Sequence, residues 1–115
     1  MTGISGESQG GLELSKYNNQ KTLVDGIMFD SKKEAKRYGE LNLLFKKGKI
    51  TYLETQPKYE IIIKGKKICS YIADFRYIIG GKEIIVEDVK GFKTSTYRLK
   101  KKLMKAIYGI DIYET

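Results

Sequence analysis

Histidine is absent from the sequence, and cysteine occurs once, at Cys69. These two facts exclude Ser-His-Asp and Cys-His nucleophiles, imidazole acid-base catalysis, zinc sites built from cysteine or histidine, and an internal disulfide. Any chemistry here has to use carboxylates and lysines, and carboxylates suit hard cations such as Mg²⁺ or Mn²⁺. With one thiol and no signal peptide at the start, we expect a reducing cytoplasm.

Long apolar runs are also missing, since no stretch approaches the roughly 18 residues that cross a bilayer. The 115 residues are 41% apolar and 31% charged, which is typical of one soluble globular domain. Lys and Arg number 22 against 14 Asp and Glu, for a net charge of +8. The favoured partner is therefore the phosphate backbone of a nucleic acid, although a basic surface that only keeps the protein soluble has the same charge.

The chain is expected to begin with a disordered leader, residues 1–16, followed by a single domain over residues 17–115. The leader is rich in Gly and Ser and has no apolar periodicity. A short apolar cluster around Asp25-Gly26 indicates a small hairpin or an extended lead-in.

Two helices are predicted. The first covers residues 31–47, begins at the N-cap Ser31 and ends at Gly48. The second runs from Thr94 or Ser95 to about residue 108 and ends at Gly109. Their expected apolar stripes are Tyr38, Leu41 and Phe45 in the first helix, and Leu99, Leu103, Ala106 and Ile107 in the second.

Between the helices, Ile, Val and Tyr predominate, and breaks at Pro57, Gly65 and Gly80-Gly81 divide the segment. This pattern predicts four strands, over residues 50–55, 58–64, 67–79 and 82–90, with the last two forming a hairpin. A short strand over residues 110–113 can return parallel through the second helix. The expected fold class is α/β, with a mixed, mostly antiparallel central sheet flanked by helices.

Acidic residues in apolar surroundings mark the candidate site, because a charge there is costly without a partner such as a metal ion. Asp74 shares a strand face with apolar side chains. Asp88 and Lys90 share a face of the next strand, so a carboxylate can hold a metal while the ammonium orients a water molecule. Glu34 lies on the apolar stripe of the first helix, where it can reach the same ion.

This ordered set, Glu34, Asp74 and Asp88-Val89-Lys90, resembles the constellation of the PD-(D/E)xK nuclease superfamily, which includes restriction endonucleases and phage Holliday-junction resolvases. From residue 17 to residue 112 the chain also resembles a family of small phage-encoded proteins regarded as endonucleases. The segments that carry this resemblance are residues 26–35, 56–57, 71–75, 87–91 and 94–100.

The resemblance implies a restriction-endonuclease-like core and a metal-dependent DNA endonuclease, encoded by a phage or prophage and acting in the bacterial cytoplasm. Structure-specific cutting, as by a Holliday-junction resolvase or a nickase, is among the implied activities, and a homodimer would suit it. Glu34, Asp74 and Asp88 would hold Mg²⁺ or Mn²⁺, and Lys90 would position the attacking water. The basic second helix is expected to contact DNA through Lys93, Tyr97, Arg98, Lys100 and Lys101.

Each candidate also has an ordinary interpretation. Glu34 completes a capping box with Ser31, and Asp88 and Lys90 can form a surface ion pair. A two-residue turn at Gly80-Gly81 would pair Asp74 with Glu87, whereas a three-residue loop or a bulge would pair it with Asp88. For the whole protein, the alternatives are a non-catalytic nucleic-acid-binding module and a phage accessory protein that binds a host protein through a strand edge.

Overall fold

The structure is a computed structural model, and it describes residues 21–89 and 93–115. The chain divides into two compact units, residues 1–38 and 39–115, and the boundary falls within the first helix. The predicted leader, residues 1–16, and the candidate Lys90 lie outside the described residues. Among the described helices, none has the length and apolar character needed to span a membrane.

In the first unit, β2 (Thr22–Val24) and β3 (Ile27–Phe29) form an antiparallel hairpin, which was one of the two predicted alternatives. Asp25 and Gly26 connect the strands with φ angles of 53° and 77°, which is the backbone of a two-residue primed turn. The Phe29 ring packs at 5.1 Å from the Tyr38 ring, and the Tyr38 hydroxyl donates to the Asp25 carboxylate at 3.3 Å. These contacts tie the hairpin to the first helix.

Helix α1 (Lys32–Lys46) begins as predicted, because the Ser31 hydroxyl oxygen accepts a 3.1 Å hydrogen bond from the Glu34 amide. It ends before Gly48, whose φ of 76° lies in the left-handed region that glycine adopts readily. Leu41 is buried as expected, but Phe45 is 44% exposed, so its predicted place in the core is wrong. Phe45 lies in the last turn of the helix.

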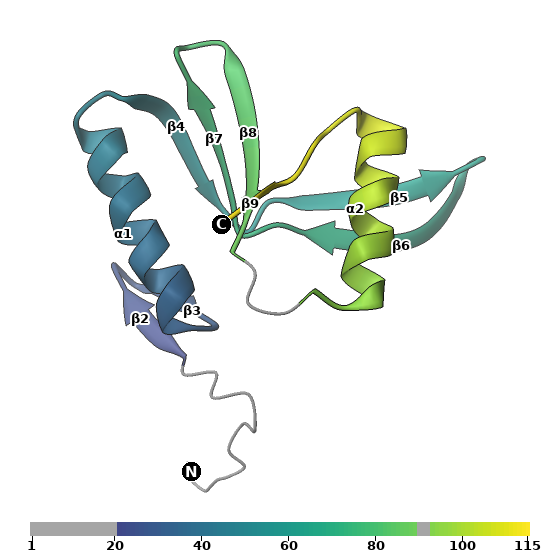
Figure 1. Ribbon diagram of the computed structural model, residues 1–115, viewed down its shortest axis with the longest axis horizontal. Helices are drawn as coiled ribbons and strands as arrows, with labels where there is room; N and C mark the ends of the chain where they lie inside the picture. The colour runs from purple at the N-terminus through teal and green to yellow at the C-terminus, as the bar shows by residue number, and fades with distance from the viewer. Residues whose placement is uncertain (1–20, 90–92) are drawn as a thin grey trace, which may run out of the picture. The chain divides into compact units, whose positions relative to one another are not determined.

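The second unit contains a four-stranded sheet in the order β4-β7-β8-β9 (Figure 1). Its strands are β4 (Ile50–Thr55), β7 (Phe75–Ile79), β8 (Glu83–Asp88) and β9 (Tyr113–Glu114). The first three run antiparallel, and β9 lies parallel to β8 after the crossover through α2. The predicted α/β class and the mixed, mostly antiparallel sheet are therefore confirmed.

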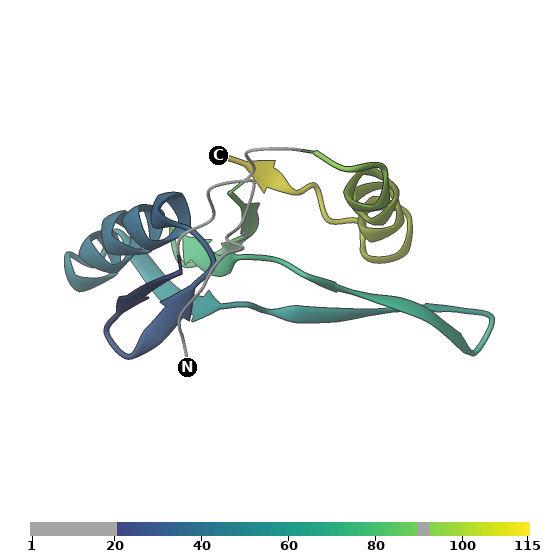
Figure 2. The same cartoon turned by 90° about the horizontal axis from the view of Figure 1, so that it is seen from below.

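A separate two-stranded sheet, β5 (Lys58–Ile63) and β6 (Lys66–Ile72), extends as a long arm (Figure 2). The prediction of one strand over residues 67–79 is wrong, because Ala73-Asp74 separates β6 from β7. The reason lies in the neighbouring strand. Gln56 has a φ of 55°, so the chain turns between β4 and β5, and the Ala73 amide follows that turn by donating to the Pro57 carbonyl at 3.1 Å.

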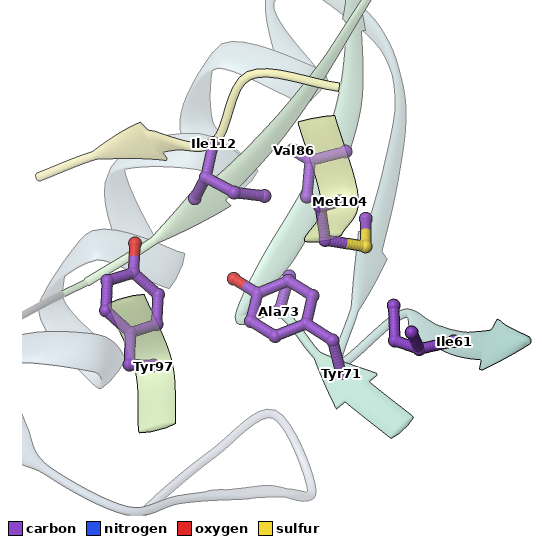
Figure 3. Packing of buried hydrophobic residues seen from close by; sticks show 7 residues of the cluster. All are labelled: Ile61, Tyr71, Ala73, Val86, Tyr97, Met104 and Ile112. Carbon is purple, nitrogen blue, oxygen red and sulfur yellow. The ribbon is translucent and has the colours of Figure 1, made fainter. Parts of the chain in front are cut away.

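Helix α2 (Ser95–Tyr108) begins at Thr94, whose hydroxyl accepts from the Tyr97 amide at 3.0 Å, and ends at Gly109 as predicted. Its buried residues are Tyr97 and Met104. The predicted stripe is therefore wrong in part. Leu103 packs against the core, but Leu99, Ala106 and Ile107 are exposed, because the helix turns its Tyr97–Met104 side to the sheet. Figure 3 shows the resulting core, in which the buried members are Ile61, Tyr71, Ala73, Val86, Tyr97, Met104 and Ile112.

Candidate active site

The β7–β8 hairpin determines which acids come together. Ile79 pairs with Glu83, so residues 80–82 form a three-residue connection and not a two-residue turn. In the same register Phe75 pairs with Glu87. The residue before Phe75 therefore comes next to the residue after Glu87, and these two residues are Asp74 and Asp88.

Two hydrogen bonds join Asp74 to the residues on either side of Asp88. The Asp74 amide donates to the Glu87 carbonyl at 3.1 Å, and the Asp74 carboxylate accepts from the Val89 amide at 2.7 Å. Asp74 thus bonds to the residues before and after Asp88. The structure brings together these two acids, which lie 14 positions apart in the sequence.

Asp88 is a buried carboxylate, with only 1% of its surface exposed. The Tyr71 hydroxyl donates a hydrogen bond to it. Burial, reinforced by the bond to Asp88, raises the pKa of Tyr71, so the phenol stays protonated and remains a donor. A buried negative charge next to a second acid is costly, and a donor or a cation offsets that cost.

Glu87, the alternative to Asp88, is also fully buried, but it faces other partners. Its carboxylate accepts from the Tyr77 hydroxyl at 2.6 Å and from the Thr115 hydroxyl at 3.0 Å. Successive strand residues point to opposite faces, so Glu87 points away from the face that Asp88 occupies. This arrangement favours a structural role for Glu87 and leaves Asp88 as the better metal ligand.

Sequence reasoning missed a third acid, Glu114. It pairs with Asp88 in the parallel β8–β9 register and therefore lies on the same face. Its carboxylate accepts from the Tyr97 hydroxyl at 2.7 Å and contacts the ammonium groups of Lys93 at 2.9 Å and Lys101 at 3.0 Å. These bonds, with that from Tyr97 the strongest, lower the pKa of Glu114 to about 2. The signal was available, because extending the last predicted strand beyond residue 113 would have included it.

A basic pocket of about 580 Å³ lies between α2 and residues 110–114. Four of its cations follow one helical stripe, at positions i, i+3, i+4 and i+7. The cations that line it are Lys93, Arg98, Lys101, Lys102 and Lys105. The pocket therefore presents positive charge on the same side of the sheet as Asp88 and Glu114.

The predicted DNA contacts divide between this pocket and its surroundings. Lys93, Arg98 and Lys101 line the pocket, and Lys100 is half-buried outside that lining. Tyr97 also borders the pocket, but it is 7% exposed, its ring packs at 6.4 Å from the Tyr71 ring, and its hydroxyl is bonded to Glu114. Those contacts favour a structural role for Tyr97 over a contact with phosphate.

The remaining sequence candidates are placed as follows. Glu34 lies in the first unit, in the first turn of α1, whereas Asp74 and Asp88 lie in the second. Gln56, from the segment 56–57 that carries the resemblance, lies beside Asp74, because its backbone amide donates to the Asp74 carbonyl at 2.9 Å. Asp74, Asp88 and Gln56 thus meet where β4 and β8 end and β7 begins.

The donor chemistry at this point matches a hard divalent cation, since carboxylate oxygens are the ligands that Mg²⁺ and Mn²⁺ prefer. The number of ligands is lower than expected. Within residues 21–89 and 93–115, no group of three or more acidic or cysteine side chains is close enough together to hold a metal ion. Asp74 and Asp88 fit two positions of such a site, and a further ligand would have to join them.

The chain belongs to the family DUF1064, described as a protein of unknown function, whose model matches residues 14–112. No curated protein and no solved structure matches the chain.

Proposed function

We propose that this protein is a metal-dependent DNA endonuclease that hydrolyses phosphodiester bonds. The observation that carries the proposal is the position of Asp74, which bonds to Glu87 and Val89 on either side of the buried Asp88. Two adjacent carboxylates, one of them buried, favour the binding of a divalent cation because the cation offsets their mutual repulsion.

Each residue of the proposed site has a distinct role. Asp74 and Asp88 would hold Mg²⁺ or Mn²⁺. Lys90 would orient the attacking water and stabilise the charge that develops on the phosphate. The bound ion would supply Lewis acidity and lower the pKa of water.

The basic pocket supports DNA as the substrate. Its five cations lie against two carboxylates, those of Asp111 and Glu114, which leaves an excess of positive charge. Because Glu114 pairs with Asp88 in the sheet, the pocket adjoins the proposed metal ligands. A strand held by its phosphates on α2 would thus lie close to the acids.

The test is a metal titration with linear, nicked and branched DNA. We expect no products in EDTA, products in Mg²⁺ or Mn²⁺, and loss of cutting in Asp74→Asn. Asp30→Asn is the matched control, because Asp30 is an exposed acid with 73% of its side chain accessible. Products from Asp74→Asn at the rate of the unchanged protein would refute the assignment. The branched arm of the panel tests whether cutting is structure-specific, as in a junction resolvase or nickase.

A second candidate is a nucleic-acid-binding module without catalysis. It is favoured by the finding that no group of three or more potential ligands converges in the part of the chain that the structure describes. In this case Asp74 and Asp88 serve the fold through Val89 and Tyr71. The module would bind DNA with strong salt dependence and would give no products at any metal concentration.

A further inference from the structure

The basic pocket has an apolar side that contact with phosphates alone does not require. Besides its cations, it is lined by Ile110 and Ile112, which belong to or pack against the core of the second unit. Its volume of about 580 Å³ lies within the range of pockets that take small organic ligands. In a regular duplex the bases are stacked and paired, so their flat faces cannot lie against such a surface.

The charges in the pocket are not all neutralised. Glu114 engages Lys93 and Lys101, and Asp111 engages Lys105 at 2.8 Å. Among the described residues, Arg98 and Lys102 have no carboxylate partner. Two cations one helical turn apart on the pocket wall are therefore available to an incoming anion.

We propose that this pocket takes one unpaired nucleotide of a DNA strand, with its phosphate on Arg98 and Lys102 and its base against Ile110 and Ile112. This proposal rests on the proposed function and specifies its substrate, which is DNA with a single-stranded or branched segment and not a continuous duplex. The pocket selects an unpaired nucleotide because its base can turn away from the stack without the cost of breaking a base pair.

The experiment compares binding by the full chain, in EDTA, of three labelled DNAs: a single strand of about 12 nucleotides, the abasic strand of the same length, and the duplex. The abasic strand keeps every phosphate and lacks the bases. We expect the base-bearing strand to bind about tenfold more tightly than the abasic strand, and also more tightly than the duplex. Equal affinity for the two single strands would overturn the proposal, and so would tighter binding of an RNA strand of the same sequence.

Variants separate the two sides of the pocket. Ile110→Ala should reduce the preference for bases to about twofold, whereas Ile107→Ala, a control on the exposed surface of α2, should leave it unchanged. The double variant Arg98→Ala with Lys102→Ala should lower the affinity for both single strands about tenfold and keep the preference for the base-bearing strand over the abasic strand. Lys46→Ala with Lys47→Ala removes the same charge elsewhere and should have a much smaller effect. Since Ile110 packs against the core, the comparison of strands with the unchanged protein stands even if Ile110→Ala does not fold.

Cleavage of the same DNAs in Mn²⁺ distinguishes the two proposals. Cutting without a preference for bases would reject the nucleotide pocket and leave the endonuclease standing. A preference for bases without cutting would reject the endonuclease and leave the pocket as a binding site.

Discussion

The Asp74 carboxylate accepts a 2.7 Å hydrogen bond from the Val89 amide, and this bond holds it beside Asp88. The bond crosses between β7 and β8 at the end of the hairpin, where Asp88 is buried against Tyr71. The proposed chemistry depends on this pairing, because neither acid alone would form a binding site for a divalent cation.

Removal of the Tyr71 hydroxyl should destabilise the fold at neutral pH. Tyr71→Phe leaves the buried Asp88 carboxylate without that donor, which costs about 1–3 kcal/mol of unfolding free energy. Urea denaturation measures the change. Tyr113→Phe is the matched control, since Tyr113 is 52% exposed and should change the free energy by less than about 0.5 kcal/mol. Equal effects of the two substitutions would show that the hydrogen bond from Tyr71 to Asp88 does not stabilise the fold.

Glu114 should make stability dependent on acid pH. Its pKa in the folded protein is about 2, below the ordinary value of 4.5, because Tyr97, Lys93 and Lys101 favour its charged form. The stabilisation is therefore complete above about pH 4.5 and is lost as the pH falls toward 2. Glu114→Gln should remove on the order of 2 kcal/mol at pH 7 and much less near pH 3.

Urea midpoints measured from pH 7 to pH 3 check this prediction. Glu83→Gln, a change of the same kind at an exposed position of β8, should give a curve parallel to that of the unchanged protein. A constant difference between Glu114→Gln and the unchanged protein over this range would mean that Glu114 does not titrate with a depressed pKa.

Thr94 should contribute to the stability of α2 as its N-cap. Thr94→Ala removes the acceptor for the Tyr97 amide and should cost about 0.5–2 kcal/mol in thermal or urea unfolding. Thr96→Ala, which changes an exposed residue of the first turn, is the control. Similar losses from both variants would indicate a general effect of helix propensity and not capping.

Lys90 should matter for cutting more than for binding. If it orients the attacking water, Lys90→Ala should slow cleavage by about 10²–10⁴-fold, with a much smaller change in DNA affinity. Lys82→Ala removes an exposed lysine from the β7–β8 connection and serves as the control. A proportional loss of affinity and rate in Lys90→Ala would instead assign Lys90 to phosphate binding.

Much of the secondary structure follows from local sequence signals. Ser31 and Thr94 are good N-caps, Gly48 and Gly109 end helices, and Asp25-Gly26 suits a tight turn, so the structure agrees with each of these predictions. Such features depend on residues within a few positions of one another. They can therefore be read without knowing the rest of the fold.

The features that were mispredicted depend on distant residues. The break at Ala73-Asp74 follows a turn at Gln56-Pro57, in a different strand, and alternation within residues 67–79 carries no sign of it. The side of α2 that is buried was also misjudged, because Tyr97 and Met104 face Tyr71 and Val86 only once the sheet exists. Tertiary contacts outweighed the local apolar pattern in both cases.

The candidate site likewise combines residues that local signals identified with an arrangement that depends on distant residues. Asp74 and Asp88 were identified from alternation and from a resemblance, but their adjacency depended on the length of the connection between β7 and β8. Glu114 was missed because the last strand was predicted to end at residue 113, one residue short of the residue that pairs with Asp88. The parallel return of this strand was predicted, but its register against β8 depends on tertiary contacts that the local pattern does not encode.

The proposed endonuclease activity requires that Asp88 hold a divalent cation. The most direct test is whether Asp88→Asn still nicks supercoiled plasmid in Mn²⁺. The substitution keeps the shape of the side chain and removes its charge, and Glu83→Gln on the same strand is the control. We predict that the unchanged protein and Glu83→Gln nick the plasmid, and that Asp88→Asn, folded to the same degree, does not. Nicking by Asp88→Asn at the rate of the unchanged protein, or the absence of nicking by every preparation, would contradict the account.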